Sequence, residues 1–236
     1  MQASQLSAEE ERDRAEGQGV RGVREGGTMK LLVLGATGGT GLEIVLQAIE
    51  RGHEVTAFVR NPERLKTFRE RVAIIRGDLL DAAELARAIE GHDAVLSAFG
   101  PRYPVAKSDA DLLHRFALGL TAAMRQAGVT RVAVESVAFL FKDAILPPAY
   151  MLGRLFFPVI VADASAMEKI ISNSGLDWTI VRPPRLTNQP RTGMYRVREG
   201  HLPSLGFTIS RADVADYMIG AIEKRTSIRR VVGVCN

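Results

Sequence analysis

The chain has 236 residues, of which 46% are hydrophobic and 25% are charged, and its 31 basic and 27 acidic side chains leave a net charge of +4. This composition is typical of one globular core, and a single cysteine, Cys235, excludes an intrachain disulfide framework and a cysteine-based zinc site. Scattered basic residues and an aromatic content of only 6% disfavour a nucleic-acid groove.

No stretch of the chain has the apolar length expected of a membrane span or a secretory signal. The best candidate, residues 151–161, is interrupted by Arg154 and Pro158, and no apolar segment follows the charged N-terminus. Together with the single cysteine, this pattern favours a cytoplasmic protein without a membrane partner.

The first 28 residues differ from the rest of the chain. They carry acids and arginines with almost no large apolar residue, so they cannot bury enough surface to offset the entropy of ordering. We therefore predict a disordered tail over residues 1–28 and one folded domain over residues 29–236. Because the first apolar strand follows Met29 directly, Met29 is a candidate for the true start of the protein, and a genuine regulatory tail is the alternative.

From residue 30 onward, short apolar runs alternate with amphipathic segments. Strands are expected at residues 30–34, 54–59, 72–75, 93–98, 130–135, 177–181 and 229–234. Helices are expected at residues 41–51, 81–89, 108–127, 162–174 and 211–224, with a short one opened by Pro62. Such alternation predicts an α/β fold with a doubly wound parallel sheet of the Rossmann type, as a single domain with a small C-terminal substrate lobe.

A glycine-rich turn lies between the first strand and the first helix, at residues 35–41. Gly35 permits a tight turn, Gly38 lets the backbone approach a diphosphate, and Gly41 lets the helix pack close to the strand. The helix N-terminus adds unpaired N–H groups and the positive end of its dipole. The turn therefore predicts a dinucleotide site that uses Gly35, Thr37, Gly38, Gly39, Thr40 and Gly41.

The end of the second strand indicates which dinucleotide is bound. An NAD site usually has a carboxylate there for the ribose 2′-hydroxyl, but this strand ends in Val59-Arg60. Arg60, with Arg64 one helical turn further on, suits a 2′-phosphate and predicts NADP(H) as the cofactor. Surface arginines in a basic chain are the alternative interpretation.

Two further segments follow strands beside the expected crevice. Asp78 is placed to accept a hydrogen bond from the adenine amino group, with Leu79 packed on the ring, and a local capping turn is the alternative. Small residues after the fourth strand would let the backbone pass close to the ribose, and these are Ser97, Ala98, Phe99 and Gly100.

These motifs resemble a known group of proteins. The glycine turn, Val59-Arg60, Gly77-Asp78 and residues 178–183 resemble the atypical short-chain dehydrogenase/reductase superfamily, in its NAD(P)H-binding NmrA-like branch. Residues 136–140, 167–169 and 183–195 are similar to the biliverdin-IXβ reductase/flavin reductase family within it. The resemblance covers roughly residues 29–235.

The resemblance implies NADPH-driven reduction of flavins and sometimes of tetrapyrroles. It also implies that Ser136, Pro183 and Pro184 lie near the nicotinamide. Three departures stand against the family pattern. A histidine after the Pro-Pro pair is Arg185 here, a histidine in a later helix is Glu168, and the superfamily's Tyr-x-x-x-Lys dyad is not intact.

The candidates for catalysis are Ser136, Tyr150 and Arg185. Tyr150 and Arg154 have the spacing of the dyad with a different base, so tyrosine acid-base chemistry and simple packing both remain open. Ser136 would bind the carboxamide or the substrate, and Arg185 would attract an anionic substrate tail. No histidine or cysteine has the spacing of a metal site. An apolar slot for a planar acceptor would be walled by Phe139, Phe141, Phe156, Phe157 and Tyr195.

Two functions from different classes fit these residues. The first is an NADPH-dependent reductase that transfers hydride to a flavin, a quinone or a similar planar acceptor. The second is a non-catalytic NADP(H)-sensing module that passes redox state to a protein partner. A sugar-nucleotide epimerase is a minor alternative, since it needs a working Tyr-Lys pair and a larger C-terminal lobe. The oligomeric state is left open.

Overall fold

The computed structural model describes residues 27–101, 106, 109–141, 155 and 157–236. Most of the predicted N-terminal tail, as well as Tyr150, Arg154 and Phe156, therefore lies outside the described residues. Within the described part, no helix combines the length and apolar character that crossing a bilayer requires.

An eight-stranded sheet forms the centre of the molecule, in the order β3-β2-β1-β4-β5-β6-β10-β8. Its strands are β1 (Lys30–Leu34), β2 (Glu54–Val59), β3 (Ala73–Arg76), β4 (Ala94–Ser97), β5 (Arg131–Glu135), β6 (Asp177–Arg182), β8 (Arg196–Glu199) and β10 (Arg230–Cys235). All neighbouring pairs are parallel except β10 and β8. The predicted Rossmann-type fold is confirmed, and the strand order reverses between β1 and β4, where such folds bind their ligands.

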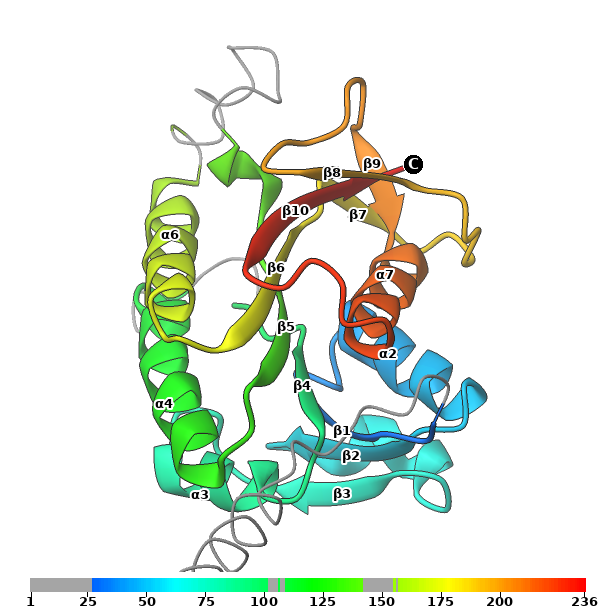
Figure 1. Cartoon of the computed structure of the whole chain (residues 1–236), viewed down its shortest axis with the longest axis vertical. Coiled ribbons are helices and arrows are strands. Elements are labelled where there is room, and N and C mark those ends of the chain that lie inside the picture. Colours follow the sequence, from blue (N-terminus) through cyan, green and yellow to red (C-terminus); the bar gives the residue numbers. More distant parts are fainter. Residues whose placement is uncertain (1–26, 102–105, 107–108, 142–154, 156) are drawn as a thin grey trace, which may run out of the picture.

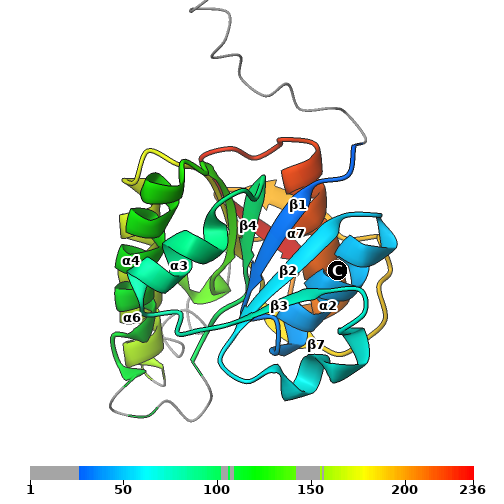
Figure 2. The ribbon, with the colours of Figure 1, turned by 90° about the horizontal axis from the view of Figure 1, so that it is seen from below.

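Helices cover both faces of this sheet (Figures 1 and 2). One face carries α3 (Ala82–Ile89), α4 (Leu112–Ala127) and α6 (Pro158–Ser172), and the other carries α2 (Gly39–Glu50) and α7 (Arg211–Glu223). Two short 3-10 helices, η1 (Pro62–Phe68) and η3 (Ala138–Leu140), connect strands to helices. The helix α6 begins at Pro158 rather than at residue 162, because proline suits the first turn of a helix.

The expected C-terminal lobe consists of short strands in the polar stretch after β6. β8 pairs with β10 at the edge of the main sheet, and β7 (Arg185–Thr187) pairs with β9 (Thr208–Ser210) in a second sheet. Residues 196–199 of β8 are all exposed, so this strand has no buried face that apolar side chains could mark. Sequence periodicity could not reveal such a strand, because its position depends on pairing alone.

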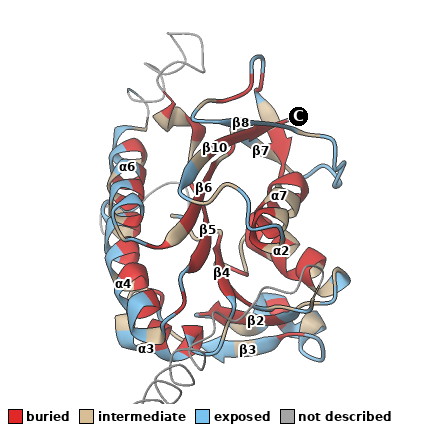
Figure 3. Cartoon of the chain, in the orientation of Figure 1, coloured by how far each residue is buried: buried red, intermediate tan, exposed pale blue. Residues whose placement is uncertain are grey.

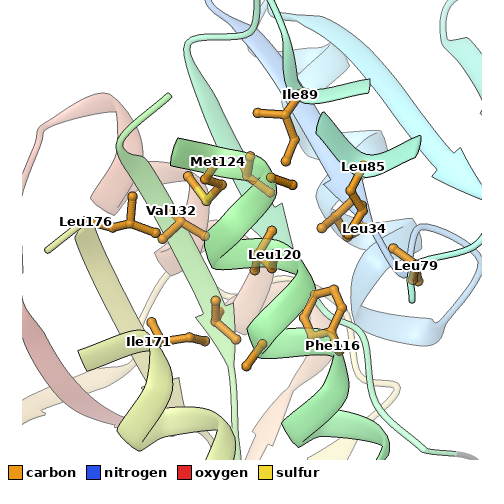
Figure 4. Packing of buried hydrophobic residues seen from close by; sticks show 14 of the residues in the cluster. Leu34, Leu79, Leu85, Ile89, Phe116, Leu120, Met124, Val132, Ile171 and Leu176 are labelled. Atoms are coloured by element: carbon orange, nitrogen blue, oxygen red, sulfur yellow. The ribbon is translucent and has the colours of Figure 1, made fainter. Parts of the chain in front are cut away.

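Two hydrophobic cores lie on either side of the sheet, and β1 contributes to both. Leu32 and Leu34 pack toward α3 and α4, whereas Leu31 and Val33 pack toward α2 and α7, and all four side chains are buried. Burial in Figure 3 follows the sheet and the inner faces of the helices, and Figure 4 shows the first core closely. This double burial fixes the carboxyl ends of the central strands, where the site lies.

Candidate functional site

The glycine turn packs tightly against the end of β4. Gly35 has a φ of 75°, and a Cβ there would lie 2.7 Å from the carbonyl oxygen of Ala98. At Gly41, a Cβ would overlap the carbonyl group of Gly35. The N–H of Gly38 donates to the carbonyl of Gly35 at 2.9 Å and closes the turn. Glycine is therefore required at these positions for steric reasons that the sequence predicted.

The N-terminus of α2 is left open by the chain's own side chains. Gly38 is the N-cap and has no side chain to cap the helix, no acidic residue lies in the first turn, and no side chain of the described residues hydrogen-bonds to the first-turn N–H groups. Such a helix end has unpaired donors and a partial positive charge, which suits a diphosphate. The residues present therefore fit a dinucleotide at the position where the strand order reverses.

A cavity of about 450 Å³ opens at this helix end. It is lined by Thr37, Gly38, Gly39, Leu42, Arg64, Asn188 and Arg211. Arg64 lies across the turn, where its Nη1 donates to the carbonyl oxygen of Thr37 at 2.8 Å. Asn188 and Arg211 were not predicted, because the chain returns to the turn from the distant C-terminal segment and no local motif indicates this contact.

The structure places Arg60 exposed, directly after the carboxyl end of β2. Arg64 belongs to η1 and reaches the same edge of the sheet. Both residues therefore follow the carboxyl end of β2, and they stay the predicted partners of a 2′-phosphate.

Replacing Arg60 with alanine is expected to weaken NADPH binding by about 1–3 kcal/mol and to change NADH binding little, since only NADPH carries the 2′-phosphate. Fluorescence titration of both cofactors measures this difference. The matched control is Arg71→Ala. Arg71 is exposed and precedes the amino end of β3, so both affinities should be unchanged. An equal loss for both cofactors in Arg60→Ala would contradict the role given to Arg60.

The segment after β3 is organised by local hydrogen bonds. Asp78 accepts from the N–H of Leu80 at 3.1 Å, and its own N–H donates to Glu84 at 2.8 Å. These contacts match the alternative interpretation, a local turn, and Asp78 itself is exposed. Leu79 is only 5% exposed and packs in the core with α3 and α4, which leaves an adenine ring little surface there.

The segment after β4 lies beside the glycine turn. Ser97 is fully buried opposite Leu34 of β1, and its hydroxyl accepts from the N–H of Phe99 at 3.4 Å. The Phe99 ring packs on Phe116 with centroids 4.8 Å apart. Ala98 supplies the carbonyl that borders the turn, and the exposed Gly100 follows.

A buried polar cluster joins the carboxyl ends of β5 and β6 to α6. Ser136 donates its hydroxyl proton to Glu168 at 2.5 Å, and Arg182 donates to both oxygens of the same carboxylate, from Nε at 2.9 Å and from Nη2. The Arg182 guanidinium also lies 4.6 Å from the centre of the Phe141 ring. Charge pairing makes burial of Glu168 tolerable. The sequence indicated Ser136 as a site residue, but no sequence pattern predicted that Arg182 pairs with Glu168.

The predicted nicotinamide-side residues meet at this cluster. Ala138, two residues after Ser136, donates its N–H to the carbonyl of Pro183 at 3.1 Å, so the two segments lie side by side. Pro184 follows and is half-buried, whereas Arg185 is exposed at the start of β7. The structure thus brings Ser136 and Pro183 together and leaves Arg185 at the surface.

Glu135, the last residue of β5, lies on the sheet face covered by α2, opposite to the face of the Ser136 cluster. The sequence analysis did not predict it as a site residue. The hydroxyl of Thr40, in the first turn of α2, donates to Glu135 at 3.2 Å. Burial raises the pKa of Glu135 to about 7, although the Thr40 hydrogen bond and the charge of Arg211 act to lower it. A carboxyl group that titrates near neutral pH therefore borders the glycine turn.

The aromatic residues expected to wall an acceptor slot separate into two groups. Phe139 and Phe157 stack with centroids 5.9 Å apart, and Phe141 lies under Arg182. Tyr195 lies elsewhere, because its ring meets Tyr217 edge-on and its hydroxyl donates to Asp216 of α7 at 2.7 Å. The expectation that Tyr195 lines the slot is therefore wrong.

The stretch around Thr192 fastens the C-terminal segment to α7. Asp213 accepts from the N–H groups of Thr192 and Gly193 at 2.8 and 2.9 Å, and from the Thr192 hydroxyl at 3.0 Å. These bonds lower the pKa of Asp213 even though burial acts to raise it. The motif thus holds the preceding Asn188 against Arg211, whose Nη1 donates to Asn188 at 2.6 Å.

The parallel sheet with an open glycine turn at its strand-order reversal defines a Rossmann-type dinucleotide-binding protein. A family described as NAD(P)H-binding matches residues 35–225, and the chain belongs to this family. The predicted resemblance is confirmed at this level, and NAD(P)H is the cofactor of the site. The closer likeness to the biliverdin-IXβ reductase/flavin reductase family stays a prediction.

Three proteins are similar to the chain over much of its length. An uncharacterised chloroplastic protein of Arabidopsis thaliana is 35% identical over 216 residues, which are 88% of this chain and 76% of that protein. The photosystem II assembly factor Ycf39 of Synechocystis is 28% identical over 155 residues, covering 65% of this chain and 44% of that protein. A solved Rossmann-fold NAD(P)-binding family protein from Shigella flexneri is 26% identical, with a TM-score of 0.67 over 88% of this chain and 93% of its own.

Proposed function

We propose that the chain is an NADPH-dependent reductase that transfers hydride to a flavin, a quinone or a similar planar acceptor. The observation that carries this proposal is the open N-terminus of α2, with Arg64 lying across the glycine turn and Arg60 in place of a carboxylate. A bound nicotinamide would supply the hydride, and the protein supplies position and a dry site.

The cluster at the ends of β5 and β6 supports the nicotinamide side of this proposal. Because the Ser136 proton is committed to Glu168, the Ser136 oxygen presents only lone pairs to its surroundings. It therefore suits an N–H donor such as a carboxamide. Arg182 holds the Glu168 carboxylate in place through two hydrogen bonds, so Glu168 and Arg182 position Ser136 and do not act on the substrate.

The stacked pair Phe139 and Phe157 supports a planar acceptor. Both rings are half-buried and belong to segments that follow the carboxyl end of β5. Aromatic faces bind flat conjugated rings through offset stacking and burial of apolar area. Arg185, exposed at the start of β7, would attract an anionic tail such as a flavin phosphate.

Turnover tests the proposal directly. The protein is mixed with NADPH and, separately, FMN, FAD, biliverdin and a quinone dye, and the loss of nicotinamide absorbance is followed. We expect NADPH consumption with at least one planar acceptor. Saturable NADPH binding with no consumption by any of the four would contradict the reductase and favour the second candidate below.

Ser136→Ala is expected to lower kcat by about tenfold and to change the dissociation constant of NADPH little, since one positioning hydrogen bond is lost. The Glu168–Arg182 pair is retained, so the fold should persist. Ser172→Ala is the matched control, because the exposed Ser172 hydroxyl donates within α6, to the Lys169 carbonyl. Unchanged kcat in Ser136→Ala would remove Ser136 from the site.

A non-catalytic NADP(H)-sensing module is the second candidate. In the described part of the chain, the Ser136 cluster bonds within itself, so it offers no free acid to a substrate. The similarity to Ycf39, a protein named as an assembly factor, also favours a role exerted on protein partners. This candidate predicts tight NADPH binding, no turnover, and a partner whose association responds to the oxidation state of the cofactor.

A further inference from the structure

Arg211 occupies the space that a side chain at position 39 would fill. A Cβ added to Gly39 would lie 2.5 Å from Cδ and 2.6 Å from Nε of Arg211. Gly39 is the first residue of α2, and its N–H belongs to the open helix end. The missing side chain at Gly39 therefore lets an arginine cross the helix terminus where the diphosphate is expected.

The position of Arg211 is fixed at both ends of the side chain. Its backbone begins α7 directly after the N-cap Ser210, whose hydroxyl accepts from the N–H of Asp213 at 2.9 Å. Its guanidinium is held by Asn188 at 2.6 Å, and both side chains line the cavity of about 450 Å³. The Arg211 guanidinium therefore already lies at the cavity before any ligand binds.

The half-buried Glu135, at the end of β5, is linked to the same structural elements. Its carboxylate accepts from Thr40 of α2 at 3.2 Å and interacts electrostatically with Arg211 of α7. Its register partner on β6 is the uncharged Val181. Glu135 is therefore linked to both groups that border the diphosphate site, the first turn of α2 and the Arg211 guanidinium.

Three other carboxylates on the flanking helices are engaged elsewhere. On α6, Glu168 is paired with Arg182 on the opposite face of the sheet. On α7, Asp213 accepts from Ser210 and from the Thr192 segment. On α2, Glu43 accepts from Gln47 at 3.4 Å. Among the described residues, Arg211 is the charged group that acts on Glu135, and a bound diphosphate would be the next.

We propose that Arg211 binds the diphosphate of the dinucleotide and that Glu135 competes with the diphosphate for this cation, so that proton uptake by Glu135 strengthens cofactor binding. An ionised Glu135 attracts Arg211 and repels the diphosphate, whereas the neutral acid does neither. The proposal rests on dinucleotide binding at the glycine turn and does not require turnover.

The sign of the pH dependence follows from linkage. A bound diphosphate raises the pKa of Glu135 above its value of about 7 in the free protein, because two negative charges would otherwise be close together. The bound state therefore holds more protons than the free state in this pH range. Cofactor affinity falls as pH rises through the two values, and reaches a lower plateau above them.

Titration of NADH by calorimetry, from about pH 5.5 to about pH 8.5, measures this effect. NADH is the probe because it lacks the 2′-phosphate, whose own second ionisation near about pH 6 would act in the opposite direction. We expect the dissociation constant of the wild-type protein to increase about three- to tenfold over this range. Glu135→Gln retains an acceptor for Thr40 and should bind tightly with no pH dependence.

Arg211→Met should weaken NADH binding about tenfold and remove most of the pH dependence, and Arg211→Lys should retain part of the affinity. The control Arg87→Met removes an exposed arginine of α3 that lies outside the cavity, and it should match the wild type. Circular dichroism checks that each variant is folded. If Arg211→Met does not fold, Arg211→Lys is used to test the role of Arg211.

A dissociation constant that does not change with pH, or an unchanged pH dependence in Glu135→Gln, would overturn the role of Glu135. Wild-type affinity in both Arg211 variants would overturn the role of Arg211. Failure of the wild-type protein to bind either NADH or NADPH is a separate result, because it would overturn dinucleotide binding itself.

Discussion

Gly41→Ala is expected to lower NADPH affinity by about 100-fold or more, which corresponds to about 2.7 kcal/mol. A Cβ at this position would overlap the carbonyl group of Gly35, and its distance to the Gly35 carbonyl carbon would be 2.7 Å. Both partners are backbone atoms of the turn, so the strain cannot be relieved by a side-chain rotation. The turn must open, and the N–H groups at the start of α2 then no longer converge on one diphosphate.

The matched control for this substitution is Gly220→Ala. Gly220 lies in α7, and a Cβ added there would meet no atom within 4 Å. Alanine should therefore raise the free energy of unfolding by about 0.5–1 kcal/mol and leave NADPH binding unchanged. Titration of both variants, with urea unfolding alongside, separates loss of the site from loss of the fold. Near-normal affinity in Gly41→Ala would refute the placement of the diphosphate.

Arg131→Met is expected to lower the free energy of unfolding by about 3–5 kcal/mol. Arg131 is 2% exposed at the start of β5, and burial, followed by the charge of Arg225, lowers its pKa to about 10. Its guanidinium donates to the carbonyls of Asp177, Ala221 and Thr226 at 2.7, 2.8 and 3.1 Å. Methionine fills similar volume but leaves these buried acceptors without their donor.

The loop after α7 explains why this arginine matters. Arg225, Ser227 and Arg229 all have positive φ values, between 49° and 57°, which cost energy in residues other than glycine. Arg131 bonds to this loop from inside and holds it closed. Arg225→Met is the control, since its exposed ion pair with Asp177 should contribute less than about 1 kcal/mol. Equal effects of the two substitutions in urea unfolding would contradict this account.

The parts of the fold that were predictable from sequence are those with strong local patterns. β1 and β2 were predicted with the bounds that they have, because strands buried on both faces are continuous apolar runs between turn residues. The C-terminus of α4 was predicted from Gly128, which has a φ of 69°. β7, β8 and β9 could not be predicted, since three or four residues of mixed polarity carry no period.

The residues of the candidate site likewise fall into those that local sequence predicts and those that only tertiary packing places. The glycine turn was predictable because its steric requirements lie within seven consecutive positions. Arg211 and Asn188 were not, because they reach the turn only through the tertiary placement of α7 and its attached loop. Glu135 was not predicted either, since an acid at the end of a buried strand is common. Its raised pKa depends on the packing of α2 and α7 over it, which no local pattern shows.

The most direct test of the central claim is calorimetric titration of the wild-type protein with NADPH and with NADH at neutral pH. The open end of α2 with Arg60 and Arg64 beside it predicts saturable binding of one NADPH per chain, about tenfold tighter or more than that of NADH. Equal affinity for the two would contradict the role of the arginines. Absence of saturable binding for both would contradict the site.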